Sequence, residues 1–242
     1  MTYEQILYAL TYKYRGNYRE VKKALLAQEL PDMIPMKEKC LFYGLKGYPK
    51  ELYDLEEPPW VLFYMGDLKL LNKPKVGIVG SRSVTPYSKK VTEILAKTLA
   101  EKYVIVSGMA KGTDCIAQFN AKETIGILGN GLDVIYPKEN MELFKLVKAK
   151  GLLLSEYPLG TQPRKEYFPY RNRIIAALSN KIIIAAAREK GGTMVTVEHG
   201  IKLGRDIYTV PYPFGCSIGK GNNQLIEEGA LIITDYEELK AL

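Results

Sequence analysis

Histidine and cysteine are scarce in this chain of 242 residues. Its three cysteines, Cys40, Cys115 and Cys216, are widely spaced and odd in number, which argues against a disulfide framework and favours a reducing compartment. With one histidine, His199, and no paired cysteines, the chain has almost no ligands for a zinc site. We therefore expect a cytoplasmic protein without a bound metal.

Long apolar runs are also missing. The longest stretch without a charged residue is Ile207–Gly219, which is interrupted by Pro211, Pro213 and Gly215. A membrane-spanning helix needs about 20 apolar residues, so no membrane span is expected. The composition, with 47% hydrophobic and 25% charged residues, is typical of a globular chain rather than a disordered one.

Catalytic groups are sparse as well. His199 falls inside a predicted helix, and no cysteine has a base near it in the sequence, so neither a Ser-His-Asp nor a Cys-His set is expected. The carboxylates Glu156 and Asp114 are isolated, and we interpret them as structural. The sequence therefore predicts a protein that binds a ligand without being an enzyme, and no cofactor is expected.

An excess of basic residues is present, and it lies in the longer C-terminal part of the chain. Lys and Arg number 34 against 27 Asp and Glu, which gives a net charge of +7. Residues 1–73 hold 11 basic and 10 acidic residues, whereas residues 74–242 hold 23 and 17. A polyanionic partner should therefore dock on residues 74–242. A contribution to solubility explains a net charge of this size equally well.

The apolar pattern divides the chain into a small helical module, residues 1–44, and an α/β domain, residues 45–242. The first part contains two amphipathic segments up to about Asp32 and a third short helix near Lys37–Gly44. Residues 45–73 are interpreted as a connector with one extra strand at Trp60–Met65. From Lys75 onward apolar strands alternate with helices, which is typical of a doubly wound, mostly parallel sheet covered on both faces. The strands expected there are Val76–Val79, Val104–Val106, Thr124–Leu128, Leu152–Leu154, Ile182–Ala186, Ile207–Val210 and Leu231–Ile233.

The turns that follow these strands carry the candidate site, because ligands of such sheets bind outside the carboxyl ends of the strands. Glycine lets a ligand approach the backbone, free N–H groups at a helix start favour phosphate, and Arg82 offers a planar fork of donors. None of the turns matches the dinucleotide or P-loop fingerprint. Three such turns on one edge nevertheless predict a phosphate or sugar-phosphate site. They contribute Gly80, Ser81 and Arg82, then Ser107, Gly108 and Lys111, and then Gly129–Gly131.

The segment Arg164–Arg173 combines charge with aromatic rings. Four basic residues accompany a single acid, Glu166, and three aromatic residues lie among them. Basic groups that follow a backbone and rings that stack on bases are what a single-stranded nucleic-acid site needs. We assign that role to Lys165 and Phe168.

The other residues of this segment are given structural roles. Tyr167 and Tyr170 are interpreted as packing on the sheet. Arg171, Asn172 and Arg173 are predicted to begin a helix, with Asn172 as its cap. Because arginine in a first turn opposes the helix dipole, Arg171 and Arg173 should have acidic or phosphate partners.

An ordered series of motifs over about residues 45–235 resembles the DNA-processing protein A family (DprA, also called Smf). The motifs are too many and too regularly ordered for an accidental match. The matching segments are Gly77–Arg82, Val106–Asp114, Gly131–Asp133 with Tyr136-Pro137, Leu154–Glu156, Phe168–Ile175, Gly204-Arg205, and Gly221–Ile226 with Gly229-Ala230.

This resemblance implies an extended Rossmann-like domain that forms a homodimer, holds single-stranded DNA in a basic pocket and loads the RecA recombinase onto it during natural transformation and recombination. It singles out Arg82, Lys165 and Phe168 in that pocket. The apolar segment Ile207–Ile218 exceeds what an inner strand requires and is the expected dimer face. The other residues expected to bind DNA are Gly80, Ser81, Ser107, Gly108, Lys111, Arg171, Asn172 and Arg173.

Two alternative functions stay open on the same fold. Nucleoside-monophosphate phosphoribohydrolases carry a Pro-Gly-Gly-x-Gly-Thr-x-x-Glu loop, which this chain matches in part. Gly191, Gly192 and Glu198 fall at the right spacing, whereas other residues occupy the proline, the third glycine and the threonine positions. The second alternative is a nucleotide-sensing module that only binds a small phosphate ligand.

Overall fold

One nine-stranded sheet organises the computed structural model, which describes all 242 residues. The strand order is β1-β2-β6-β5-β4-β3-β7-β8-β9. Strands β3 to β9 run parallel, while β1 and β2 join antiparallel at the edge beside β6. This confirms the predicted doubly wound, mostly parallel sheet. The strands are β1 (Cys40–Phe42), β2 (Val61–Gly66), β3 (Lys75–Gly80), β4 (Val104–Ser107), β5 (Thr124–Leu128), β6 (Leu152–Ser155), β7 (Lys181–Ala186), β8 (Asp206–Thr209) and β9 (Leu231–Ile232).

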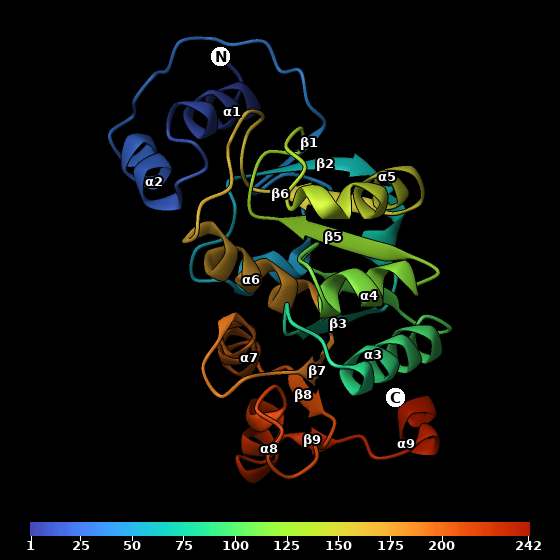
Figure 1. Cartoon of the computed structure of the whole chain (residues 1–242). Coiled ribbons are helices and arrows are strands. Elements are labelled where there is room, and N and C mark those ends of the chain that lie inside the picture. The colour runs from blue at the N-terminus through green and yellow to red at the C-terminus, as the bar shows by residue number, and fades with distance from the viewer.

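Helices cover both faces of the sheet (Figure 1). Several begin at side-chain caps that the sequence supplies: Thr2 and Gln5 form a capping box at the first helix, as do Thr85 and Ser88 at the third. None of the helices has the length and apolar character needed to cross a membrane. The helices are α1 (Tyr3–Lys13), α2 (Tyr18–Leu26), α3 (Pro86–Leu99), α4 (Thr113–Phe119), α5 (Met141–Lys150), α6 (Tyr167–Leu178), α7 (Gly192–Lys202), α8 (Lys220–Glu227) and α9 (Tyr236–Ala241), with short 3₁₀ helices at Lys50–Asp54, Leu68–Asn72 and Lys138–Asn140.

The core lies in two apolar layers because successive residues of a strand point to opposite faces. Val79 of β3 belongs to a buried cluster with Ile174 of α6 and Val197 of α7. Its neighbour Ile78 belongs to a cluster on the other face with Leu95 of α3. Helices α6 and α7 therefore share one face and pack against each other, which brings their first turns to the carboxyl edge of the sheet.

Two local predictions were wrong. The segment predicted as a helix near Lys37–Gly44 contains strand β1 instead, in which Cys40 pairs with Phe63 of β2. Pairing satisfies the backbone groups of the edge strand, and this tertiary gain outweighs the local helical spacing. Helix α6 begins at Tyr167, so Asn172 lies inside the helix and does not cap it.

Helix α1 rests on the antiparallel edge of the sheet. Leu7 and Tyr8 share a buried cluster with Phe63 of β2 and Phe144 of α5. The hydroxyl of Tyr8 also donates a hydrogen bond to Glu38, in the segment that leads to β1. The first helices and the sheet are therefore joined by a common core, and the division of the chain into residues 1–44 and 45–242 stays a prediction.

Candidate functional site

A cleft of about 570 Å³ opens at the carboxyl edge of the sheet, where β3 and β7 are neighbours. From β3 the chain continues through α3 to β4 on one side, and from β7 it continues through α7 to β8 on the other. Open α/β sheets bind their ligands at such a reversal of strand order. The turn after β3, the first turn of α6 and the first turn of α7 all line this space, which we call the main cleft.

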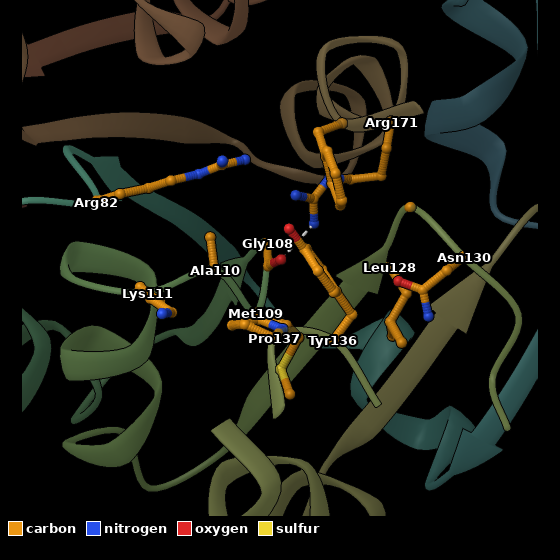
Figure 2. A pocket seen from close by; sticks show the side chains of 12 residues that line it. Arg82, Gly108, Met109, Ala110, Lys111, Leu128, Asn130, Tyr136, Pro137 and Arg171 are labelled. Atoms are coloured by element: carbon orange, nitrogen blue, oxygen red, sulfur yellow. Dashed lines mark hydrogen bonds between the residues drawn. The ribbon is translucent and has the colours of Figure 1, made fainter. Parts of the chain in front are cut away.

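A smaller cavity of about 60 Å³ extends the main cleft toward β4 and β5 (Figure 2). Arg82, Ala110, Tyr136, Phe168 and Arg171 line both spaces. Figure 2 shows the side chains of Arg82, Tyr136 and Arg171 converging from different elements. We call this space the inner cavity.

Stacked rings and a guanidinium form one wall of the main cleft. Phe168, in the first turn of α6, stacks on Tyr136 with ring centroids 5.3 Å apart and planes 21° apart. The guanidinium carbon of Arg82 lies 5.3 Å from the centroid of the Phe168 ring. Phe168 is half-buried, whereas Tyr136 and Arg82 are exposed. The wall therefore presents a planar apolar surface next to a positive charge, which matches a nucleobase and its phosphate.

Three exposed cations line the main cleft, and the chain does not neutralise them. They are Arg82 after β3, Lys165 before α6 and Arg188 after β7. None of the three forms an ion pair with a carboxylate of the chain. Free cations around a concave surface attract an anionic ligand and concentrate it there.

The buried side chain of Arg171 links two backbone segments at the bottom of the site. Its Nη1 donates hydrogen bonds to the carbonyl oxygen of Gly108, at 2.6 Å, and to that of Ile127. A Cβ atom at position 108 would lie 2.5 Å from this Nη1, so a larger residue there would displace the Arg171 guanidinium. Burial lowers the pKa of Arg171 to about 10, and the neighbouring charge of Arg82 adds to that shift, while Asp114 opposes it.

The buried carboxylate of Asp114 acts on Arg171 electrostatically, but the two side chains form no ion pair. The acidic or phosphate partner expected for Arg171 is therefore not present as a direct contact within the chain. Oδ2 of Asp114 accepts hydrogen bonds from the backbone N–H groups of Gly108, at 3.2 Å, and Ala110, at 3.3 Å. Burial raises the pKa of the Asp114 carboxyl, while the Arg171 guanidinium opposes that rise. Together the two side chains clamp the loop between β4 and α4, and that loop forms part of the inner cavity.

Arg173 lies outside both cavities and forms a buried ion pair. Its Nη1 and Nη2 donate to Oε1 and Oε2 of Glu156 at 2.7 and 2.6 Å, and the two side chains are 5% and 2% exposed. The ring of Tyr170 lies 3.7 Å from the Arg173 guanidinium carbon. Although burial opposes it, the paired carboxylate raises the pKa of Arg173. The expected acidic partner of Arg173 is therefore Glu156, and Tyr170 packs on Arg173.

The structure brings together most of the remaining predicted residues. Gly80, Ser81 and Asn172 line the main cleft, and the Asn172 side-chain amide donates to the carbonyl oxygen of Gly192 at 3.1 Å. Lys111 lines the inner cavity, where its Nζ lies 2.6 Å from Glu139. The roles of these residues in binding stay predictions.

Ser107 is not brought to the site surface. It is buried below the inner cavity and lines neither space. Its hydroxyl donates to the carbonyl oxygen of Ile78 at 2.7 Å, which ties β4 to β3.

Two further residues of the main cleft, Arg188 and Tyr136, were not predicted to belong to the site. Arg188 follows β7 directly and could have been found by the same rule that selected Arg82 after β3. Tyr136 lies in the long connection between β5 and α5, where nothing in the local pattern indicates that its ring reaches Phe168.

The residues that match the phosphoribohydrolase loop do not all lie at the main cleft. Gly191 and Gly192 line the main cleft, but Glu198 is exposed on α7 and does not. His199 is half-buried on the same helix, and burial together with the charges of Arg173 and Lys202 lowers its pKa. No cluster of three His, Cys, Asp or Glu side chains is placed to hold a metal ion.

Comparisons with known proteins identify relatives of this chain. The family model for DNA recombination-mediator protein A matches residues 39–241. DNA processing protein DprA of Streptococcus pneumoniae is 40% identical over 198 residues, which are 80% of this chain and 70% of the relative. The X-ray structure of DprA from the same organism superimposes with a TM-score of 0.82 at 36% identity and covers 92% of this chain and 80% of that one. A structure of Helicobacter pylori DNA processing protein A, which concerns that protein's single-stranded DNA binding mode, has a TM-score of 0.79 at 38% identity and covers 85% of this chain and 95% of that one.

Proposed function

The chain belongs to the DNA recombination-mediator protein A family, and from that premise we propose that it binds single-stranded DNA in the main cleft and delivers the strand to the RecA recombinase. The observation that carries the proposal is the wall formed by Arg82, Phe168 and Tyr136. A base stacks on the Phe168 ring while Arg82 and Lys165 neutralise the phosphates on either side. The Helicobacter pylori relative, whose structure concerns a single-stranded DNA binding mode, supports the choice of ligand.

The cleft favours a single strand because its rings can stack only on bases that are released from a duplex. Stacking on an aromatic ring tolerates every base, since each has a π-face. Gly191 and Gly192 at the start of α7 add backbone N–H groups to the rim, and N–H groups of a first turn lack helical acceptors and favour phosphate. Binding to DNA is therefore independent of base sequence and sensitive to salt. A protein that binds arbitrary incoming DNA and then releases it needs both properties.

We also propose that two copies pair through the region of Ile207–Ile218. Within this segment Ile207, Val210 and Tyr212 are buried in the chain's own core, whereas Phe214 is fully exposed. Strand β9 beside it ends the sheet, so its outer edge is free for a second copy. Two linked clefts raise the effective concentration of DNA and hold an extended strand for RecA. Light scattering tests the dimer: a Phe214→Glu variant should be a monomer at concentrations where the unchanged protein is a dimer.

The direct test of DNA binding compares oligo-dT with a duplex of equal length. Fluorescence anisotropy at moderate salt should give clearly tighter binding of the single strand. Equal or tighter binding of the duplex would overturn the proposed preference. Delivery to RecA is tested separately: filament assembly on the bound strand should accelerate with the unchanged protein and not with Arg82→Ala. These steps belong in the cytoplasm, where RecA meets incoming strands.

A further inference from the structure

A second cleft of about 560 Å³ lies between the N-terminal helices and the loop that leads into α6. Residues 13–19, which end α1 and begin α2, form one wall. The loop from β6 to α6 forms the other wall, and Figure 1 shows it extending toward α1 before it turns back to α6. This second cleft shares no lining residue with the main cleft.

Residues 164–168 contribute side chains to both clefts. Lys165 and Phe168 line the main cleft, whereas Arg164 and Tyr167 line the second. In each pair a cation precedes an aromatic ring by three residues. Residues 164–168 therefore form a ridge that offers the same combination, a basic group with a ring, to the spaces on its two sides.

The two clefts also share the geometry of their rings. In the main cleft Phe168 stacks on Tyr136 and lies under a guanidinium at 5.3 Å. In the second cleft Tyr167 stacks on Tyr157, with centroids 4.3 Å apart and planes 23° apart. The guanidinium carbon of Arg164 lies 5.7 Å from the Tyr167 centroid. Each cleft thus contains a half-buried ring that is supported by a second ring and accompanied by an exposed arginine.

The charge of the second cleft favours an anionic ligand. Lys13, Arg15, Arg19 and Arg164 line it, against the two carboxylates Glu57 and Glu166. Arg19 is already paired with Glu57 at 2.7 Å, and Lys13 with Glu29 at 2.8 Å. Arg15 and Arg164 form no ion pair within the chain, so both are available to phosphate groups.

We propose that the second cleft is a further subsite for single-stranded DNA, so that one strand crosses the ridge and stacks bases on both Phe168 and Tyr167. The inference rests on the proposed function, because it extends the strand bound in the main cleft. It gives the N-terminal helices a direct role in binding through Arg15. A strand long enough to reach across the ridge gains affinity, and a shorter strand occupies the main cleft alone.

The experiment measures affinity for oligo-dT of increasing length, from about 4 to about 20 nucleotides, by fluorescence anisotropy. Tyr167→Ala should leave the shortest bound oligonucleotides unaffected and weaken the longest by about five- to a hundredfold. Arg15→Ala and Arg164→Ala should each reduce the salt slope by about 0.7, and only for long strands. Tyr167→Phe keeps the ring and should bind like the unchanged protein.

Two controls separate this inference from the proposed function. Phe168→Ala should weaken binding at every length, while Lys97→Ala, which removes an exposed cation on α3, should change neither length dependence nor salt slope. If the unchanged protein does not bind oligo-dT, the proposed function fails. If it binds and the second-cleft variants keep its length dependence, only the inference fails. The inference would also be overturned if the second-cleft variants lost affinity equally for oligo-dT of every length. The same holds if poly-Glu binds the protein through Arg15 and does not affect the binding of long oligo-dT.

Discussion

The guanidinium of Arg82 lies over the ring of Phe168, 5.3 Å from its centroid, although the two residues come from different layers of the fold. Arg82 follows β3, and Phe168 belongs to the first turn of α6. Because a charge and a stacking surface meet at one point, their contributions to DNA binding can be separated experimentally. In the proposed binding mode, the charge of Arg82 would contribute a salt-dependent part of the affinity, and the ring of Phe168 a part that does not depend on salt.

Removal of a cation from the main cleft should reduce the salt dependence of DNA binding. We expect Arg82→Ala and Lys165→Ala each to lower the slope of log affinity against log salt by about 0.7, because each neutralises about one phosphate of a single strand. Arg188→Ala should behave alike. Anisotropy titrations of oligo-dT at several salt concentrations measure this slope. Unchanged slopes in all three variants would mean that the strand does not use this cleft.

Removal of the ring should weaken binding without changing the salt slope. Phe168→Ala should reduce the free energy of binding by about 1–3 kcal/mol, since it deletes one base-stacking surface. Phe168→Tyr preserves that surface and serves as the control. The same titrations report both quantities, and a Phe168→Ala variant with full affinity would exclude stacking at this position.

The buried pair of Arg173 and Glu156 should matter for stability more than for DNA contact. Arg173→Met leaves a buried carboxylate without its partner and should lower the free energy of unfolding by about 3–5 kcal/mol. The exposed pair of Lys145 and Glu142 provides the comparison, and Lys145→Ala should cost less than about 1 kcal/mol. Urea denaturation measures both. Similar values for the two variants would contradict the burial argument.

Because His199 is the only histidine, its contribution to the pH dependence of stability can be measured by itself. Burial, together with the nearby charges of Arg173 and Lys202, lowers the pKa of His199 in the folded chain below its ordinary value of 6.5. The unfolded chain therefore binds the proton first, so stability should fall as the pH drops from 6.5 through the lowered value. NMR titration of the imidazole gives this pKa directly. His199→Gln should remove that part of the acid destabilisation, and a pKa at or above 6.5 would contradict the assignment.

Nucleoside monophosphates should not be hydrolysed. Glu198, which would be the acid of a phosphoribohydrolase loop, is exposed on α7 and does not line the main cleft. Incubation with purine and pyrimidine monophosphates should therefore release no free base. Turnover that disappears in Glu198→Gln would replace the binding function with the hydrolase alternative.

Local sequence patterns predicted the inner strands well. Apolar runs placed both ends of every strand from β3 to β9 within one residue, because strand period and turn chemistry are properties of neighbouring residues. The same patterns brought Gly80, Arg82 and Gly108 to one edge, since parallel strands all end on the same side of a sheet. The combination of Lys165 with Phe168 was visible from composition alone.

Contacts between distant segments decided the rest. Cys40–Phe42 became a strand only because β2 offers it a pairing edge, and Arg173 became structural only because Glu156 lies buried beside it. The second cleft exists because the turn between α1 and α2 meets the loop before α6. The sequence by itself determined the order of strands and helices along the chain and the sheet edge that carries the candidate site, because both follow from local spacing. The tertiary structure alone decided which charged side chains are buried with a partner and which stay exposed without one, because that depends on what distant segments bring to each of them.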